Sequence, residues 1–90
     1  MKEMTKYENK IVIVTGGFDP LHSGHINLFK SAAKLGSRLI VGINSNKWLL
    51  RKKGYIFQAF SERKLIISNL NMVNEVIKIW IKIFLKKQEF

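Results

Sequence analysis

Two histidines at the end of a glycine turn are the residues of this sequence best suited to chemistry. The stretch Thr15-Gly-Gly-Phe-Asp-Pro-Leu-His-Ser-Gly-His25 places His22 and His25 three residues apart. It follows a β-branched run and opens a helix-like pattern, which is where α/β sheets place anion sites. Glycines let a ligand approach the backbone, and N–H groups at a helix start bind phosphate oxygens. We therefore predict a phosphate-binding turn whose two imidazoles stabilise charge developing on a phosphorus centre.

The common phosphate-binding signatures do not describe this turn. No Gly-Lys-Ser/Thr follows it, so it is not a Walker P-loop, and the Gly-x-Gly-x-x-Gly spacing of dinucleotide sites is missing. A histidine pair at this spacing could instead be solvent-exposed or a chance metal pair, but the surrounding strand, turn and helix favour the phosphate site. Asp19 has two interpretations, a turn former before Pro20 or a residue of the catalytic site.

The segments around the turn alternate between strand-like and helix-like patterns. Strands are predicted at about 10–14, 38–43 and 73–80, and helices at about 24–35, 47–51 and 61–70. The β-branched first strand is expected to be buried on both faces. Gly36 is expected to end its helix in the left-handed conformation, and Ser61 to cap the start of the last helix, with Glu62 in its first turn.

A strand, helix, strand, helix, strand order is one mononucleotide-binding half of a doubly wound fold. We therefore predict an α/β, Rossmann-like parallel sheet within a three-layer sandwich, with strand order 3-2-1 and residues 1–90 as a single partial domain. The tail from Glu75 to Lys87 fits two patterns. Its alternating isoleucines suit a strand, and its lysines at intervals of four suit a helix, so we expect a strand at first and a helix later.

Composition narrows the classes of function. Sixteen Lys and Arg against six acids give a net charge of +10, which attracts polyanions, although lysines scattered over solvated faces give the same total. Nucleic acid is therefore not the expected main partner. With no cysteine there is no disulfide or thiolate metal site. No segment has the length of uninterrupted apolar sequence that a membrane span needs, and the expected location is the cytoplasm.

The sequence from Gly16 to His25 resembles the signature of the cytidylyltransferase-like nucleotidyltransferases. That family includes glycerol-3-phosphate cytidylyltransferases and heptose-phosphate adenylyltransferases. The resemblance continues in the segments Leu39–Asn46, Phe60-Ser-Glu-Arg-Lys64 and Val73-Asn-Glu-Val-Ile77, so it covers about residues 10–77.

The resemblance implies roles for individual residues of the turn. His22 and His25 would contact the nucleotide phosphates and stabilise the transition state, and Gly17 and Phe18 would bind nucleotide through the backbone. Gly16 and Asp19 belong to the same nucleotide-binding turn.

Two cations outside the turn are candidates for binding substrate phosphate. Lys52 falls near a family lysine that neutralises substrate phosphates, or it is one solvated member of a basic run. Arg63 is the arginine of the Glu-Arg-Lys helix, with a substrate-phosphate contact as one interpretation and a structural or interface arginine as the other.

The implied reaction transfers CMP or AMP from CTP or ATP to a small phosphorylated alcohol or sugar. Pyrophosphate leaves, and Mg²⁺ assists while bound through the nucleotide phosphates. Two departures from the family stand out. Asn46-Lys47 replaces an acidic pair, and the sequence ends at Phe90 before the family's last two strands and its Ile-Ser-Ser/Thr-Thr-type motif. The alternative is therefore an inactive remnant or half-domain that binds phosphate ligands or a protein partner, completed by a second copy or another chain.

Overall fold

A computed structural model of the chain describes residues 9–79. Its elements are β1 (Ile11–Gly16), α1 (Ser23–Ala33), β2 (Arg38–Asn44), α2 (Asn46–Lys53), α3 (Phe60–Ser68) and β3 (Glu75–Ile79). The predicted alternation of strands and helices is confirmed, with ends that differ by a few residues. The tail after residue 79, which fitted both a strand and a helix, lies outside the described residues. Within residues 9–79 no helix is long and apolar enough to cross a membrane.

The three strands form a parallel sheet in the order β1-β2-β3, as the strand pattern predicts. Ile40 in the central strand pairs with Ile13 on one side and with Glu75 on the other. Asn74 fixes the start of β3, because its Oδ1 accepts the Leu39 N–H at 2.7 Å and its own N–H donates to the Leu39 carbonyl at 2.9 Å. The register of β3 therefore depends on one side chain just before the strand.

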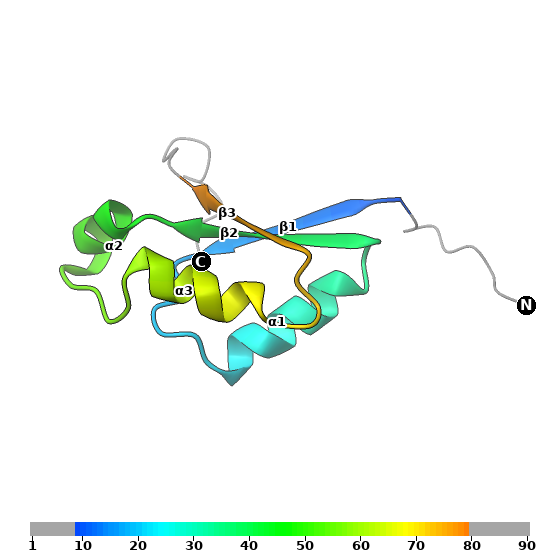
Figure 1. Ribbon diagram of the computed structural model, residues 1–90, viewed down its shortest axis with the longest axis horizontal. Coiled ribbons are helices and arrows are strands. Elements are labelled where there is room, and N and C mark those ends of the chain that lie inside the picture. The colour runs from blue at the N-terminus through cyan, green and yellow to red at the C-terminus, as the bar shows by residue number, and fades with distance from the viewer. Residues whose placement is uncertain (1–8, 80–90) are drawn as a thin grey trace, which may run out of the picture.

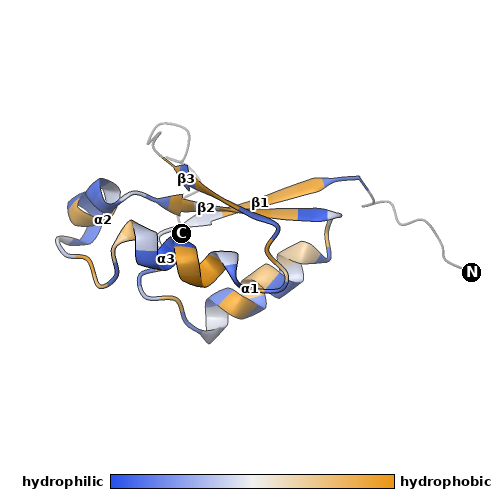
Figure 2. Cartoon of the chain, viewed as in Figure 1, coloured by the Kyte–Doolittle hydropathy of each residue, from blue (hydrophilic) through white to orange (hydrophobic). Residues whose placement is uncertain are grey.

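Helices α1 and α3 cover one face of the sheet, and α2 lies beyond the carboxyl end of β2 (Figure 1). The central strand supplies the middle of the core with alternate side chains, Leu39, Val41 and Ile43, which pack with Phe29 and Ile67. Figure 2 shows the hydrophobic residues gathered along the strands and on the helices beneath them. Residues 9–79 thus form two layers of the predicted three-layer sandwich.

The first strand is only half buried, so the expectation that both of its faces are buried is wrong for this part of the chain. Val12 and Val14 pack against the core. Ile11 and Ile13, on the other face, are 59% and 57% exposed. The reason is topological, since both helices lie on the same side of the sheet and β1 is its edge strand within residues 9–79.

Two predicted helix ends are also corrected by the structure. Gly54, at the end of α2, is the glycine with a positive φ within residues 9–79, so Gly36 does not have the predicted left-handed conformation. A Cβ at Gly36 would lie 2.5 Å from the Lys10 carbonyl oxygen, so glycine is needed there for space. Ser61 does not cap α3. The helix starts at Phe60, whose N–H donates to Asn46 Oδ1 at 2.8 Å, while Glu62 occupies the first turn as expected.

Candidate active site

The two histidines are locked together at the start of α1. His22 is the N-cap residue, and its Nδ1 accepts the Gly24 N–H at 3.1 Å. His25 reaches back in the same way, and its Nδ1 accepts the His22 N–H at 3.1 Å. The rings stack with centroids 3.8 Å apart and planes at 28°. This is a capping box built from imidazoles, in which each ring satisfies an N–H group that the helix start leaves unpaired.

These bonds fix which nitrogen of each ring carries its proton. Because both Nδ1 atoms accept a backbone N–H, the neutral rings must hold their hydrogen on Nε2. Each ring therefore offers an Nε2–H donor to a ligand. Gly24 makes the arrangement possible, since a Cβ there would lie 2.9 Å from Cε1 of His22.

The neutral form of His25 is favoured further by its surroundings. Burial lowers the pKa of His25 below its ordinary value of 6.5, and the adjacent His22 lowers it further. Protonation at Nδ1 would also replace the acceptor facing the His22 N–H with a second donor, so the capping bond would be lost. At neutral pH His25 is thus an uncharged donor through Nε2.

Both rings face a single cavity of about 360 Å³ at the carboxyl end of β1. Its lining residues are Gly17, Phe18, Asp19, Pro20, His22, His25, Trp48, Leu49, Lys52 and Lys53. The structure therefore brings the histidines and Gly17 to one cavity, as the sequence predicts, and Lys52 lines the same cavity. Gly16 ends β1, is buried, and is not among these lining residues. A cavity of this size suits part of a nucleotide.

Phe18 anchors the turn by packing its side chain into the core. Its φ of 50° lies in the left-handed region, which is uncommon for a residue with a side chain. Its ring is 5% exposed and makes edge-on contacts with Phe29 and His25, at centroid distances of 5.2 Å and 5.1 Å. Packing of this ring thus stabilises the strained backbone and supports one of the two histidines.

The side chain of Asp19 makes structural hydrogen bonds, which agrees with its interpretation as a turn former. Its buried carboxylate accepts the N–H groups of Phe57 at 2.8 Å and Gln58 at 2.6 Å, and it pairs with Lys53 Nζ at 3.1 Å. Burial raises the pKa of Asp19, but the hydrogen bonds and Lys53 outweigh it, and the pKa lies below its usual value. Both oxygens are engaged, so the side chain anchors the segment after α2 to the turn.

Arg63 also takes the structural role that the sequence left open. Its guanidinium is 1% exposed and donates to the carbonyl oxygens of Gln58, Gly17 and Asn44, at 2.9, 3.0 and 2.7 Å. A further bond of 2.8 Å goes to Asn46 Oδ1. Arg63 therefore joins the glycine turn, the end of β2 and the start of α2 from beneath, and it does not line the cavity as a substrate-phosphate contact would require.

The far wall of the cavity comes from α2, which the sequence analysis left without a role apart from Lys52. Ser45 caps this helix, and its Oγ accepts the Trp48 N–H at 3.2 Å. Lys52 Nζ lies 5.4 Å from the centroid of the Trp48 ring, within cation–π range. Lys53 was missed, although the basic run that contains it was noted. Its Nζ donates to the Asp19 carbonyl at 2.6 Å, so it ties α2 to the turn.

Metal ligands are scarce at this site. Within the part of the chain that the structure describes, no group of three or more His, Cys, Asp and Glu side chains could hold a metal ion. The carboxylate that lines the cavity belongs to Asp19 and is already engaged by three donors. A cation at this site would therefore have to be carried mainly by the phosphates of a ligand.

The fold and the site together define an α/β domain with a histidine-bearing turn beside a cavity at the carboxyl end of its first strand. The sequence profile described as Cytidylyltransferase-like matches residues 13–82. The chain belongs to the cytidylyltransferase-like family.

Individual relatives are consistent with this assignment. The chain is 41% identical over 68 residues to glycerol-3-phosphate cytidylyltransferase of Bacillus subtilis (strain 168), covering 76% of this chain and 53% of the relative. It is 37% identical over 65 residues to phosphopantetheine adenylyltransferase of Pyrobaculum aerophilum, covering 72% and 42%.

A solved structure shares the fold. The lipopolysaccharide core biosynthesis protein from Thermoplasma volcanium GSS1 superposes with a TM-score of 0.73 at 34% identity, covering 84% of this chain and 62% of that one. The present chain spans about half the length of the curated relatives it matches.

Proposed function

We propose that this chain carries the phosphate-binding half of a nucleotidyltransferase site. The site would transfer CMP or AMP from CTP or ATP to a small phosphorylated alcohol or sugar, with release of pyrophosphate. The observation that carries the proposal is that both histidines line one cavity with Gly17 while their Nδ1 atoms are engaged, which leaves Nε2–H as the donor of each ring. Membership of the family supports it, as do relatives named as cytidylyl- and adenylyltransferases.

In the proposed reaction a phosphate oxygen of the acceptor attacks the α-phosphorus of the nucleotide. The new oxygen–phosphorus bond forms as the bond to the β-phosphate oxygen breaks, and pyrophosphate leaves with its electron pair. The protein contributes positioning and charge stabilisation and no nucleophile. His22 and His25 would donate Nε2–H to the phosphate oxygens as negative charge grows there, and Lys52 would add positive charge at the cavity wall. Mg²⁺ bound to the triphosphate would neutralise part of its charge.

Binding without turnover is the second candidate function. It is favoured by the open side of the cavity, because within residues 9–79 no strand pairs with the outer edge of β1. The exposed Ile11 and Ile13 on that strand would suit contact with a second copy of the chain or a partner chain. Such a half-domain would hold nucleotide phosphates and would need the other chain for an active site.

The test is pyrophosphate release by the purified chain, with CTP or ATP and Mg²⁺ over several phosphorylated acceptors. We expect release with at least one pairing and a loss of about 100- to 1,000-fold on His22→Ala or His25→Ala, the usual effect of removing one such donor. Ser23→Ala is the matched control, since it changes an exposed side chain between the histidines. Release that does not depend on either histidine would contradict the proposal. Nucleotide binding with no release would establish the second candidate.

A further inference from the structure

A second cavity, next to Trp48, is lined by positively charged side chains. Its volume is about 320 Å³, and its lining residues are Ser45, Asn46, Lys47, Trp48, Arg51 and Lys78. Trp48 lines the histidine cavity as well, so the two cavities share one wall. None of the lining residues that the structure describes is acidic.

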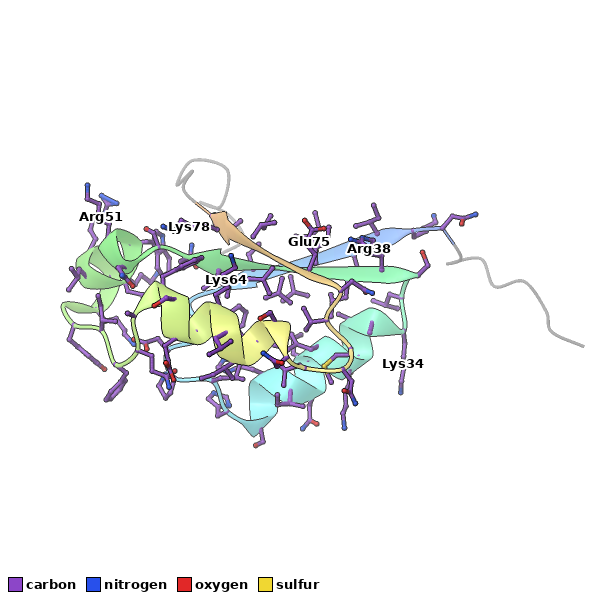
Figure 3. The ribbon with its side chains drawn as sticks, in the orientation of Figure 1. Lys34, Arg38, Arg51, Lys64, Glu75 and Lys78 are labelled. Carbon is purple, nitrogen blue, oxygen red and sulfur yellow. The ribbon has the colours of Figure 1, made fainter. Side chains whose placement is uncertain are left out.

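The cations of this second cavity come from two elements that meet at one end of the molecule. Lys47 and Arg51 are four residues apart on α2, so they occupy the same face of that helix. Lys78 comes from the carboxyl end of β3. Figure 3 shows Arg51 and Lys78 at the same end, far from Lys34. Like charges at this spacing repel one another, and the attraction of each cation to a bound anion would offset that repulsion.

The start of α2 adds donors and no negative charge. The first turn of a helix favours acidic side chains, yet the first turn of α2 has none and instead contains Lys47. Asn46 contributes a further donor. Its Oδ1 is occupied by the Phe60 N–H and by Arg63 Nη2, both at 2.8 Å, so the NH₂ group is the part of this amide that can serve a ligand. The polar groups at this cavity are therefore predominantly hydrogen-bond donors.

We infer that this cavity is a second anion site, which holds a carboxylate or phosphate group of the acceptor other than the phosphate that attacks the nucleotide. The acceptor class is then a small phosphorylated compound with an additional anionic group, lying across Trp48. The guanidinium of Arg51 can grip a planar carboxylate with two parallel N–H bonds. The role of the acceptor rests on the proposed function, whereas anion binding at this cavity does not.

The test compares two ligands that differ by one charge. The probes are 3-phosphoglycerate and glycerol 3-phosphate. The first has a carboxylate at the position where the second has a hydroxymethyl group. Each is titrated into the full ¹⁵N-labelled chain, and the backbone amides of Lys47 and Arg51 are followed by NMR. We expect 3-phosphoglycerate to bind about tenfold more tightly, the effect of one charge-assisted contact, and to shift both amides.

Two variants locate the effect. Arg51→Ala combined with Lys78→Ala should abolish the preference by weakening 3-phosphoglycerate more than glycerol 3-phosphate. The fold should be retained, because both residues are exposed and outside the core. Lys34→Ala, at the opposite end of the molecule, should change neither affinity. Equal affinities for the two probes, or a preference that survives in the double variant, would overturn the inference.

A parallel titration separates this inference from the proposed function. Inorganic phosphate should still shift the Lys47 amide in a His22→Ala/His25→Ala chain, and failure to do so would overturn the second site. Mg²⁺ with CTP or ATP is added to the unmodified chain. No response at the histidine turn, with the phosphate response at Lys47 intact, would overturn the proposed function alone.

Discussion

Replacing Asp19 by asparagine should destabilise the fold far more than its conservative chemistry suggests. The carboxylate accepts two backbone N–H groups, at 2.8 and 2.6 Å, and the Lys53 ammonium at 3.1 Å, in a fully buried position. The amide of Asp19→Asn keeps one oxygen and turns its NH₂ group toward a donor. About two charge-assisted bonds are lost at ~1.5 kcal/mol each, so we expect a loss of about 3 kcal/mol.

The assay is urea unfolding of both chains as a function of pH. The folded pKa of Asp19 lies below its ordinary value of 3.8, so folding favours the charged form. The stabilisation is therefore fully present above pH 3.8 and is lost as the pH falls through the lower folded pKa. Asp19→Asn has no such group, so the difference between the two chains should shrink over that acid range.

Glu75→Gln is the matched control. Glu75 pairs with Arg38 at 3.0 Å, but both side chains are about half exposed, and such a pair contributes less than ~1 kcal/mol. Asp19 would not anchor the turn if Asp19→Asn cost no more than Glu75→Gln at neutral pH. The same would follow if the difference in stability between Asp19→Asn and the unmodified chain were independent of pH in the acid range.

Three further predictions concern other parts of the site and fold. Arg63→Lys keeps the charge but loses the planar fork, so it should lower the free energy of unfolding by about 2–3 kcal/mol in urea titrations, and a loss below ~0.5 kcal/mol would contradict its assigned role. The His25 imidazole should titrate by NMR below its ordinary value of 6.5, and a midpoint above that value would contradict the burial and capping described here. Gly36→Ala should cost about 1–3 kcal/mol, because the new methyl group meets the Lys10 carbonyl oxygen, and unchanged thermal stability would show that the backbone can yield there.

Much of the fold could be predicted because local patterns and topology agree. β-Branched runs separated by helical periods leave few arrangements other than a parallel sheet, and the structure has the expected strand order. Burial was harder to predict, since a run such as Ile11-Val-Ile-Val14 looks the same whether one face or both are covered. The difference lies in which side the connecting helices take, which is a property of the whole sheet.

The site was predictable where function depends on neighbours in sequence. His22 and His25 meet because three residues span the first turn of a helix. The side-chain partners of Asp19 lie 34 to 39 residues away along the chain. Arg63 reaches Asn44 across 19 residues and Gly17 across 46, so the burial of neither side chain could be read from local sequence. Lys53 and Trp48 were missed for the same reason, since only the packing of α2 against the turn places them at the cavity.

The most direct test of the account is the response of the two imidazoles to a nucleotide. The chain contains two histidines, so a long-range ¹H–¹⁵N NMR spectrum of an untagged sample resolves both rings. In the free protein both rings should carry the proton on Nε2, and titration with CTP or ATP in the presence of Mg²⁺ should shift both Nε2 signals along one saturation curve. If one ring responds without the other, or both carry the proton on Nδ1, then the histidines do not converge on the same phosphate.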